Sequence, residues 1–528
     1  MPDGVVVSLT ALLPELLLVI AACAVLLVGP GRREGGGAAP VLTLVALLLA
    51  LIVLRFGETL GIRGGSGGGL SFDELAKYVR TSTAVIGILI TMAAWSQPAA
   101  GERGEFFAMM LFSLSGLMLV GASSDLVTLF LALELVSIPA YTLVTLSRTD
   151  LKALEAGTKY FYLGAMAAAI NAYGFSFLYG VAGSADLGDV TRAVASALAK
   201  PAQVLPYTLA MLGVTLSVAG LLFKIAAFPL HFYIGDVYQG AAAPVAGMLG
   251  YVPKLAGFVA ILKVVAATNV WRGGDVPLFW VLWWVAVLSM TIGNTLALMQ
   301  TNVRRMLAYS GIAHSGYMLV GLIAGPLAGP GVIGDGAAAI LYYTVIYGIA
   351  NLGAFTLLGL LRVRGEPAET VRDLAGLLRR HPGLALLMAL AMLTLMGLPP
   401  TPGFWGKMAL FGSALASVKD SGPLNQWVVA LVVIAVINTA VAAAYYLRVV
   451  ASLLLYENDE PAEARQADAP QMGVVLCGFL LLIFAFFPNA LMNFGRAASG
   501  PLRAQATPMR LDVPVQSHPP DAGHVHPS

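Results

Sequence analysis

The stretch LLFKIAAFPLHFY, residues 221–233, places a lysine, a proline and a histidine in an otherwise apolar run. Proline removes a backbone hydrogen-bond donor and clashes with the preceding helical turn, so a helix through this run should break near Pro229. Inside a lipid bilayer, broken backbone is tolerated only against protein or beside a water-filled cavity. If this run crosses a membrane, we therefore expect Lys224 and His231 at a wet, protein-lined site.

The composition indicates that the chain does cross a membrane. Of its 528 residues, 58% are hydrophobic and 11% are charged, whereas soluble domains carry about 25% charged residues. The net charge of +2 argues against nucleic acid as a partner. Cys23 and Cys477 lie in apolar runs near opposite ends of the chain. They have no CxxC or metal-ligand spacing, which argues against a disulfide framework, a zinc site or an iron–sulfur cluster.

Apolar runs long enough to span a bilayer, about 20 residues each, recur along the chain. They lie near residues 9–28, 40–56, 80–97, 106–121, 125–146, 158–181, 204–235, 243–268, 278–299, 306–324, 337–361, 383–418, 427–455 and 473–495. We expect 14 membrane helices and no barrel, because strand alternation is absent. The first run lacks a basic flank and a clear cleavage site, so we interpret it as a membrane helix rather than a removed signal.

The connecting segments set the expected orientation. Arg and Lys mark cytoplasmic loops, and they gather in alternate loops, beginning with the one that contains Arg32 and Arg33. We therefore expect both termini on the non-cytoplasmic side. Residues 61–70 form a Gly-rich loop, 363–382 a basic loop with a short helical piece, and 456–470 an acidic loop. The Pro-rich tail from Pro501 is expected to be disordered, and solvated rather than metal-binding despite its three histidines.

Lysine is scarce in this chain. There are nine Lys against 21 Arg, yet Lys224, Lys254, Lys263 and Lys407 all fall within apolar runs. A buried lysine can lose its proton, whereas arginine stays charged. A charge at mid-membrane costs about 2.5–3.5 kcal/mol and usually serves an ion path. We favour that role for Lys224. Lys263 lies near the end of its run, so we expect its side chain to extend to the lipid headgroups.

Glu134 is the first candidate partner of Lys224. It lies nine positions after Asp125, an expected helix cap, which places it about 13 Å deep at 1.5 Å per residue. We favour an ion pair that serves proton transfer, and a fixed packing pair is the alternative. Lys159 stands four residues after Glu155 in the favourable order. For this lysine, an interfacial salt bridge and a transport role both remain open.

The run at 383–418 repeats the pattern of a lysine beside a break. Pro399 and Pro400 precede Lys407 there. Broken helices at corresponding places in two halves are typical of inverted-repeat transporters, with the site at the break. His231 and His314 also lie in apolar runs. A neutral imidazole can relay a proton between a lysine and a glutamate, although a lone histidine in a helix is often a core residue.

Three stretches carry a resemblance to a known family: FKIAAFPLHFYIGDVYQGAAAPV (223–245), GNTLALMQTNVRRMLAYSGIAHSGYM (293–318) and GLPPTPGFWGKMALF (397–411). They resemble subunit N of proton-translocating NADH–quinone oxidoreductase, respiratory complex I. The superfamily includes the M and L subunits of that complex and the Mrp-type antiporters. The resemblance covers most of the chain, and DVY at residues 236–238 is typical of N subunits.

The resemblance implies an all-α polytopic membrane protein of 14 helices, with two inverted five-helix repeats and broken helices 7 and 12. It divides the chain into residues 1–105 (helices 1–3), 106–270 (first repeat, helices 4–8), 271–456 (second repeat, helices 9–13), 457–500 (acidic loop and helix 14) and 501–528 (disordered tail). It also implies a proton path through Glu134, Lys224, Lys254, His314 and Lys407, with His231 and Lys159 at further polar positions of the family.

The implied activity is proton pumping across a bacterial plasma (inner) membrane, driven by electron transfer from NADH to quinone. The chain has no nucleotide-binding motif, so NADH, FMN, iron–sulfur clusters and quinone would belong to partner subunits. The implied neighbours are the antiporter-like M subunit and the small K and J subunits. The alternatives are a subunit of an Mrp-type Na⁺/H⁺ antiporter and a structural membrane subunit.

The chain departs from the family pattern at four positions. Tyr233, Gly235, Gln239 and Gly311 stand where Trp, Pro, Glu and Ser are usual in the family. These changes affect the wall of the first break more than the titrating groups.

Overall fold

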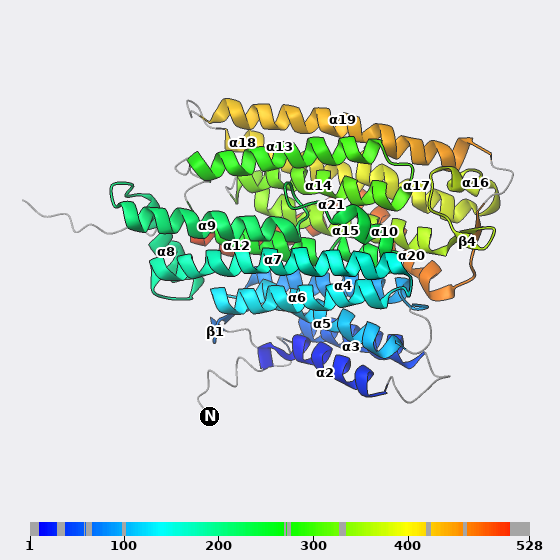
Figure 1. Ribbon diagram of the computed structural model, residues 1–528, viewed down its shortest axis with the longest axis horizontal. Coiled ribbons are helices and arrows are strands. Elements are labelled where there is room, and N and C mark those ends of the chain that lie inside the picture. The colour runs from blue at the N-terminus through cyan, green and yellow to red at the C-terminus, as the bar shows by residue number, and fades with distance from the viewer. Residues whose placement is uncertain are drawn as a thin grey trace, which may run out of the picture.

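Long helices that run nearly parallel make up the protein (Figure 1). The computed structural model describes residues 10–28, 37–57, 59, 66–97, 102–268, 271, 276–326, 334–418, 424–457 and 462–506. The N-terminal helices are α2 (Leu13–Val28), α3 (Ala38–Phe56) and α4 (Glu74–Ala93). A buried ion pair, in which an Arg80 nitrogen lies 2.6 Å from a Glu15 oxygen, joins α2 to α4.

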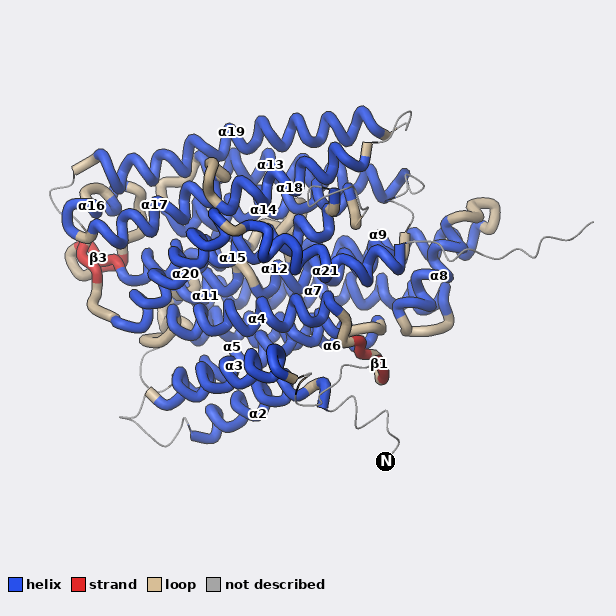
Figure 2. Tube along the Cα trace, turned by 180° about the vertical axis from the view of Figure 1, so that it is seen from behind, coloured by secondary structure: helices blue, strands red, loops and turns tan. Residues whose placement is uncertain are grey.

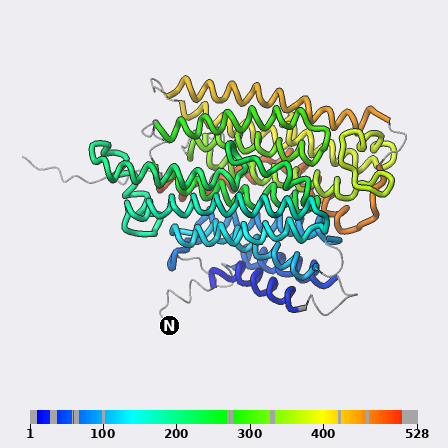
Figure 3. Tube along the Cα trace, in the orientation of Figure 1, coloured from blue at the N-terminus to red at the C-terminus, as the bar shows by residue number. Residues whose placement is uncertain are grey.

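Two series of helices follow. The first contains α5 (Arg103–Ala122), α6 (Leu126–Leu146), α7 (Leu151–Ala182), α8 (Leu187–Leu198), α9 (Val204–Lys224), α10 (Ile234–Gly240), α11 (Ala243–Leu249) and α12 (Val252–Ala266). The second contains α13 (Val276–Leu298), α14 (Val303–Ala324), α15 (Gly336–Leu360), α16 (Leu377–Arg380), α17 (Pro382–Met396), α18 (Pro402–Ser417) and α19 (Asn425–Leu455). Finally, α20 (Asp468–Phe486) and α21 (Pro488–Ala506) end the described chain. Helices α2 and α3 lie at one edge of the bundle and α19 at the opposite edge (Figure 3).

The predicted all-α membrane architecture is confirmed. Within the described residues, 12 helices are long and apolar enough to cross a membrane, and the shorter apolar helices Leu13–Leu27 and Pro382–Met396 lie in the two remaining predicted runs. Helices α4 and α7 begin before the apolar pattern does, because aspartates cap them. Asp73 accepts a hydrogen bond from the backbone N–H of Ala76, and Asp150 does so from that of Ala153.

The helices at the centre of the bundle are buried on all sides. In residues 243–266 and in α15, the apolar 18-residue stretch that could span a membrane is 100% buried, whereas the corresponding stretch of α3 is 28% buried. A helix that is apolar all round has no face suited to water, so it belongs in a large core or against lipid. Helix α15 is apolar all round and lies in the core of the bundle, next to the residues of the site.

Both predicted breaks are present. Residues 225–233 separate α9 from α10, and residues 397–401 separate α17 from α18. Each broken pair follows the third long helix of its series, which matches the expected inverted-repeat pattern. A third interruption at residues 250–251, between α11 and α12, was not predicted, since the apolar run continues through it.

Short strands lie only at the ends of the helices among the described residues (Figure 2). Strands β1 (Ser66–Gly67) and β2 (Leu70–Ser71) form one hairpin, and β3 (Leu361–Val363) pairs with both β4 (Glu366–Pro367) and β5 (Glu463–Ala464). The basic loop and the acidic loop thus meet in one small sheet, which the sequence did not predict. A 3₁₀ turn (Arg372–Leu374) and α16 form the expected short helical piece.

The prediction that a disordered tail starts at Pro501 is wrong for its first residues. Helix α21 continues through Pro501 to Ala506, and Arg503 donates to a carboxylate oxygen of Asp335 at 2.7 Å. This contact ties the end of α21 to the start of α15. Residues 507–528, including the three histidines, lie outside the described residues.

Candidate functional site

Glu134 and Lys224 form the expected ion pair. Asp125 caps α6 by accepting from the backbone N–H of Thr128, and this start places Glu134 in the middle of the helix. Lys224 is the last residue of α9, and its Nζ lies 3.2 Å from Oε1 of Glu134 and 2.6 Å from Oγ of Ser137. The Lys224 side chain is 4% exposed and that of Glu134 is 18% exposed. The pair is therefore buried on the lysine side and reachable from outside on the carboxylate side.

The first break leaves backbone groups that other segments satisfy. The hydroxyl of Tyr233 donates to the carbonyl oxygen of Phe223 at 2.8 Å. From the second series, Oγ of Ser289 accepts from the backbone N–H of Phe228 at 2.9 Å. Polar groups freed inside a membrane must find partners within the protein. Tyr233, one of the departures from the family pattern, thus provides such a partner at the end of α9.

Lys254 lies on α12, the helix that packs against Lys224. A Cβ atom added to Gly257 would lie 3.1 Å from Cβ of Lys224, so the two helices are in close contact one turn beyond Lys254. Nζ of Lys254 donates to the carbonyl oxygen of Gly311 at 2.6 Å and lies 4.5 Å from the ring centre of Tyr347. Gly311 leaves room for this ring, since a Cβ there would lie 2.8 Å from the Tyr347 hydroxyl oxygen.

His314 is buried on α14 among tyrosines. Its Nδ1 lies 2.8 Å from the hydroxyl of Tyr343 and its Nε2 lies 2.9 Å from the hydroxyl of Tyr446. The ring centres of Tyr347 and Tyr317 lie 4.9 and 5.8 Å from that of the imidazole. Whichever nitrogen carries the proton, each nitrogen therefore has a hydroxyl group that can donate or accept.

Lys407 lies at the second break. Its Nζ donates to the carbonyl oxygen of Met396, the last residue of α17, at 2.9 Å. The same ammonium lies 4.7 Å from the ring centre of Tyr317. Gly397 takes a φ of +84°, which other residues adopt only with strain, and this turn brings the end of α17 against the lysine. A carbonyl freed by the break thus binds the lysine directly.

Helix packing and these contacts place the five principal predicted residues in one series, which we call the lysine–histidine line: Glu134, Lys224, Lys254, His314 and Lys407. Between Lys224 and Lys254 the link is the close approach of α12 to Lys224 at Gly257. Two tyrosines bridge the gaps on either side of His314. The Tyr347 ring contacts both Lys254 and His314, and the Tyr317 ring contacts both His314 and Lys407. Sequence reasoning missed these tyrosines, because an aromatic residue in an apolar run looks like ordinary core.

His231 lies in the first break but outside this line. Its side chain stacks on Phe232, with ring centres 4.8 Å apart, and also contacts Phe228. The residue is 6% exposed, and its Nδ1 has no hydrogen-bond partner among the described residues. No described contact joins it to Lys224 or Lys254.

Lys159 lies at the end of the bundle near α10. It forms the expected salt bridge with Glu155 at 2.6 Å and a second one with Asp236 at 2.8 Å, and its side chain is 42% exposed. Arg305 binds the same aspartate at 2.8 Å and donates to Oε1 of Gln239 at 3.1 Å. Gln239 thus accepts a hydrogen bond at a position where the family usually has Glu.

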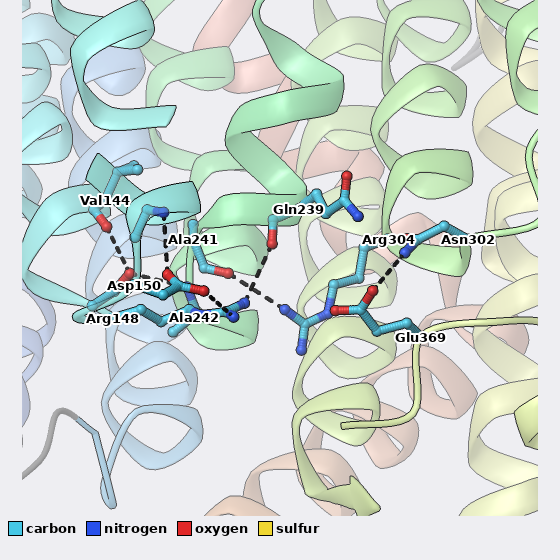
Figure 4. Close-up of polar contacts among 11 residues, drawn as sticks. Val144, Arg148, Asp150, Gln239, Ala241, Ala242, Asn302, Arg304 and Glu369 are labelled. Atoms are coloured by element: carbon cyan, nitrogen blue, oxygen red, sulfur yellow. Dashed lines mark hydrogen bonds and ion pairs between the residues drawn. The ribbon is translucent and has the colours of Figure 1, made fainter. Parts of the chain in front are cut away.

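A layer of polar contacts next to this cluster joins the two series of helices (Figure 4). Arg148 donates to a carboxylate oxygen of Asp150 at 2.6 Å and to the carbonyl oxygen of Gln239 at 3.5 Å. From α14, Arg304 reaches the carbonyl oxygen of Ala241 at 3.4 Å. The segment between α10 and α11 is therefore held by cations from both sides.

The prediction that Lys263 reaches the lipid headgroups is wrong. Its side chain does not reach outward to headgroups but is buried, with the residue 6% exposed. Nζ donates to the carbonyl oxygens of Val120, Gly121 and Ser123 at 2.8, 2.9 and 2.7 Å. The last carbonyls of a helix lack partners within the helix and favour a cation. Lys263 therefore caps the C-terminal end of α5.

Two broken helices, each beside a buried lysine, and a line of titratable groups between them define an antiporter-like membrane protein. Residues 123–448 match the family model described as NADH:quinone oxidoreductase/Mrp antiporter, TM. The chain is 36% identical over 431 residues to NADH-quinone oxidoreductase subunit N of Trichlorobacter lovleyi, covering 81% of this chain and 83% of that protein. The chain belongs to the subunit N family of NADH-quinone oxidoreductase.

Solved structures show the same fold. A chain of respiratory complex I from Thermus thermophilus with bound Aureothin matches with a TM-score of 0.73 and 31% identity, covering 91% of this chain and 98% of that chain. A chain of the Mrp complex from Dietzia sp. DQ12-45-1b matches with a TM-score of 0.76 and 19% identity, covering 95% of this chain and 100% of that chain. The Mrp likeness shows the shared fold alone, so the N-subunit assignment rests on the closer sequence relatives.

Proposed function

We propose that the chain is a proton-translocating membrane subunit of NADH-quinone oxidoreductase and that its protons pass along the lysine–histidine line. The observation that carries this proposal is the succession of titratable groups from the Glu134–Lys224 pair at the first break, through Lys254 and His314, to Lys407 at the second. A packing role needs no succession of titratable groups, whereas a proton path requires one.

The mechanism is electrostatic. At an effective dielectric constant of about 20, unit charges 3.2 Å apart, as in the Glu134–Lys224 pair, attract by about 5 kcal/mol. A charge change or movement in the neighbouring subunit weakens this attraction, and Lys224 then releases its proton. The 18% exposure of Glu134, between the exposed side chains of Leu131 and Ile138, makes the carboxylate accessible to such a neighbour.

The proton then moves through Lys254 and His314 to Lys407. The carbonyl partners of Lys254 and Lys407 accept from an ammonium, and no carboxylate among the described residues pairs with either lysine. A lysine with carbonyl partners alone can take up and release a proton more readily than one with a carboxylate. Lys159 and His231 are further candidates, at the exposed end of α7 and at the first break.

Redox chemistry belongs to partner subunits in this proposal: NADH, FMN, the iron–sulfur clusters and quinone bind there. The neighbours would be the M, K and J subunits in a bacterial plasma membrane. Both termini would face the non-cytoplasmic side, since arginine-rich loops gather at the opposite ends of the helices. An Mrp-type antiporter subunit is the second candidate, supported by the shared fold.

The test is Lys224→Met in inverted membrane vesicles from the native host, with Lys77→Met as a matched control. Lys77 lies on α4 with its side chain 45% exposed, outside the line. Because a positioned acid or base contributes about 10²–10⁴-fold, NADH-driven quinone reduction and proton uptake should both fall by about that factor in Lys224→Met. NADH oxidation by a hydrophilic acceptor and assembly on a native gel should stay normal. Normal quinone reduction and proton uptake in assembled Lys224→Met would refute the proposal.

A further inference from the structure

Four arginines surround a cavity of about 460 Å³ at the end of the bundle where β3 and β5 meet. The lining residues, which we call the arginine pocket, are Arg362, Arg364, Gly365, Arg380, Glu463, Ala464 and Arg465. Four positive charges and one negative charge give this pocket a formal charge of +3. The lysine–histidine line makes no use of it.

The local sequence builds this pocket. Strands β3 and β4 are joined by the two-residue turn Arg364–Gly365, whose φ values are +52° and +85°. Such turns favour positive φ at both central residues and match the twist of a hairpin. On the other side of β3, Glu463 of β5 stands opposite Arg362. Because side chains alternate between the faces of a strand, Arg465 lies on the same face as Glu463 and Arg362.

Arg362 is held firmly in this pocket. Its guanidinium donates to the carbonyl oxygens of Gly359 and Leu361 at 3.1 and 3.0 Å, at the end of α15. Partial burial is the main cause that lowers the pKa of Arg362, and the positive charge of Arg465 is the second. The negative charge of Glu366 raises this pKa, but by less. Like charges are thus crowded around a fixed guanidinium, and an anion would relieve their repulsion.

The general excess of arginine in cytoplasmic loops does not explain this convergence. Arg379 precedes Arg380 directly, yet it points elsewhere and pairs with Glu457. An orientation signal needs basic residues in the loop, but it does not need them around one cavity. The guanidinium group is also the side chain best matched to phosphate oxygens, because it can donate two parallel hydrogen bonds.

We propose that the arginine pocket binds the phosphate of an anionic phospholipid headgroup. The pocket lies at the ends of membrane helices, where headgroups are expected: Leu361 follows α15 directly, Arg380 precedes α17 and Arg465 precedes α20. Basic pockets at the ends of membrane helices are typical sites for such headgroups.

Apolar side chains next to the pocket provide a surface for the acyl chains. Leu386 on the first turns of α17 is 57% exposed, and Met472 and Val475 on the first turns of α20 are 52% and 47% exposed. A soluble phosphate compound would make no use of this surface. A cationic cavity whose lining residues are followed in the chain by exposed apolar helix turns therefore favours a lipid over a free anion.

The experiment uses the purified, delipidated complex and fluorescent phosphatidylglycerol in detergent, with fluorescent phosphatidylcholine as the zwitterionic comparison. The double variant Arg380→Gln/Arg465→Gln removes two exposed lining charges, and Arg379→Gln is the matched control. At about 1 kcal/mol per basic residue near a lipid surface, the double variant should bind phosphatidylglycerol about thirtyfold more weakly. Arg379→Gln should bind it like the wild type.

Competition on the wild-type complex tests the proposal without any variant. Unlabelled phosphatidylglycerol should displace the probe, whereas inorganic phosphate at the same concentration should not. Equal displacement by inorganic phosphate would assign the pocket to a soluble phosphate compound and overturn the lipid proposal. Equal binding of the phosphatidylcholine probe, or unchanged binding in the double variant assembled on a native gel, would also overturn it.

Discussion

Replacing Lys224 by arginine separates proton transfer from packing. Arginine keeps the positive charge and the attraction to Glu134, which at 3.2 Å amounts to about 5 kcal/mol at a dielectric constant of about 20. Its unperturbed pKa exceeds that of lysine by about 2–3 units, and each unit corresponds to about 1.4 kcal/mol. A step that requires the neutral side chain therefore becomes about 10²–10³ times slower, while the ion pair remains.

The assay is NADH-driven proton uptake by inverted vesicles, normalised to assembled complex on a native gel. Lys77→Arg, on the exposed face of α4, controls for the substitution itself. We expect assembled Lys224→Arg complex with proton uptake reduced by about 10²-fold or more. Wild-type proton uptake in Lys224→Arg would show that a fixed cation is sufficient at this position, and the proton-transfer role of Lys224 would be refuted.

Three further substitutions test other parts of the structure. Lys263→Met removes the cap of α5 and leaves its last carbonyl oxygens without their donor. The protein should be destabilised by about 1–3 kcal/mol, seen as less assembled complex on a native gel, and normal assembly would contradict the capping role. Tyr347→Leu removes the cation–π interaction between the Tyr347 ring and the Lys254 ammonium, which contributes about 1–2 kcal/mol. Proton uptake should therefore fall more in Tyr347→Leu than in Tyr347→Phe, which keeps the ring. Equal proton uptake in both variants would contradict the bridging role. Asp335→Asn weakens the tie between α15 and Arg503 and should cost about 1–3 kcal/mol, measured as a lower melting temperature of the purified complex, and an unchanged melting temperature would exclude it.

The helices and the first ion pair could be predicted from the sequence because their signals are local. Apolar runs, the cap at Asp125 and the position of Pro229 each depend on neighbouring residues. The pairing of Glu134 with Lys224 needed one further argument, that a buried charge requires a partner. Few other charges were available at that depth.

The remaining contacts depend on tertiary packing that no local pattern encodes. Lys263 looked like a lysine near a helix end, but its carbonyl partners lie about 140 residues earlier, around Ser123. Tyr343, Tyr347 and Tyr446 reach His314 from α15 and α19, and Tyr446 is separated from His314 by 132 residues. Strand β5 likewise pairs with β3 across the whole of α17, α18 and α19.

The central claim is that protons pass along one buried line that ends at Lys407. The most direct test is proton uptake in Lys407→Met, because this change leaves the Glu134–Lys224 pair intact and removes only the last titrating group. We predict assembled complex, normal NADH oxidation by a hydrophilic acceptor, and proton uptake and quinone reduction that both fall by about 10²-fold. Wild-type proton uptake in assembled Lys407→Met complex would contradict the account.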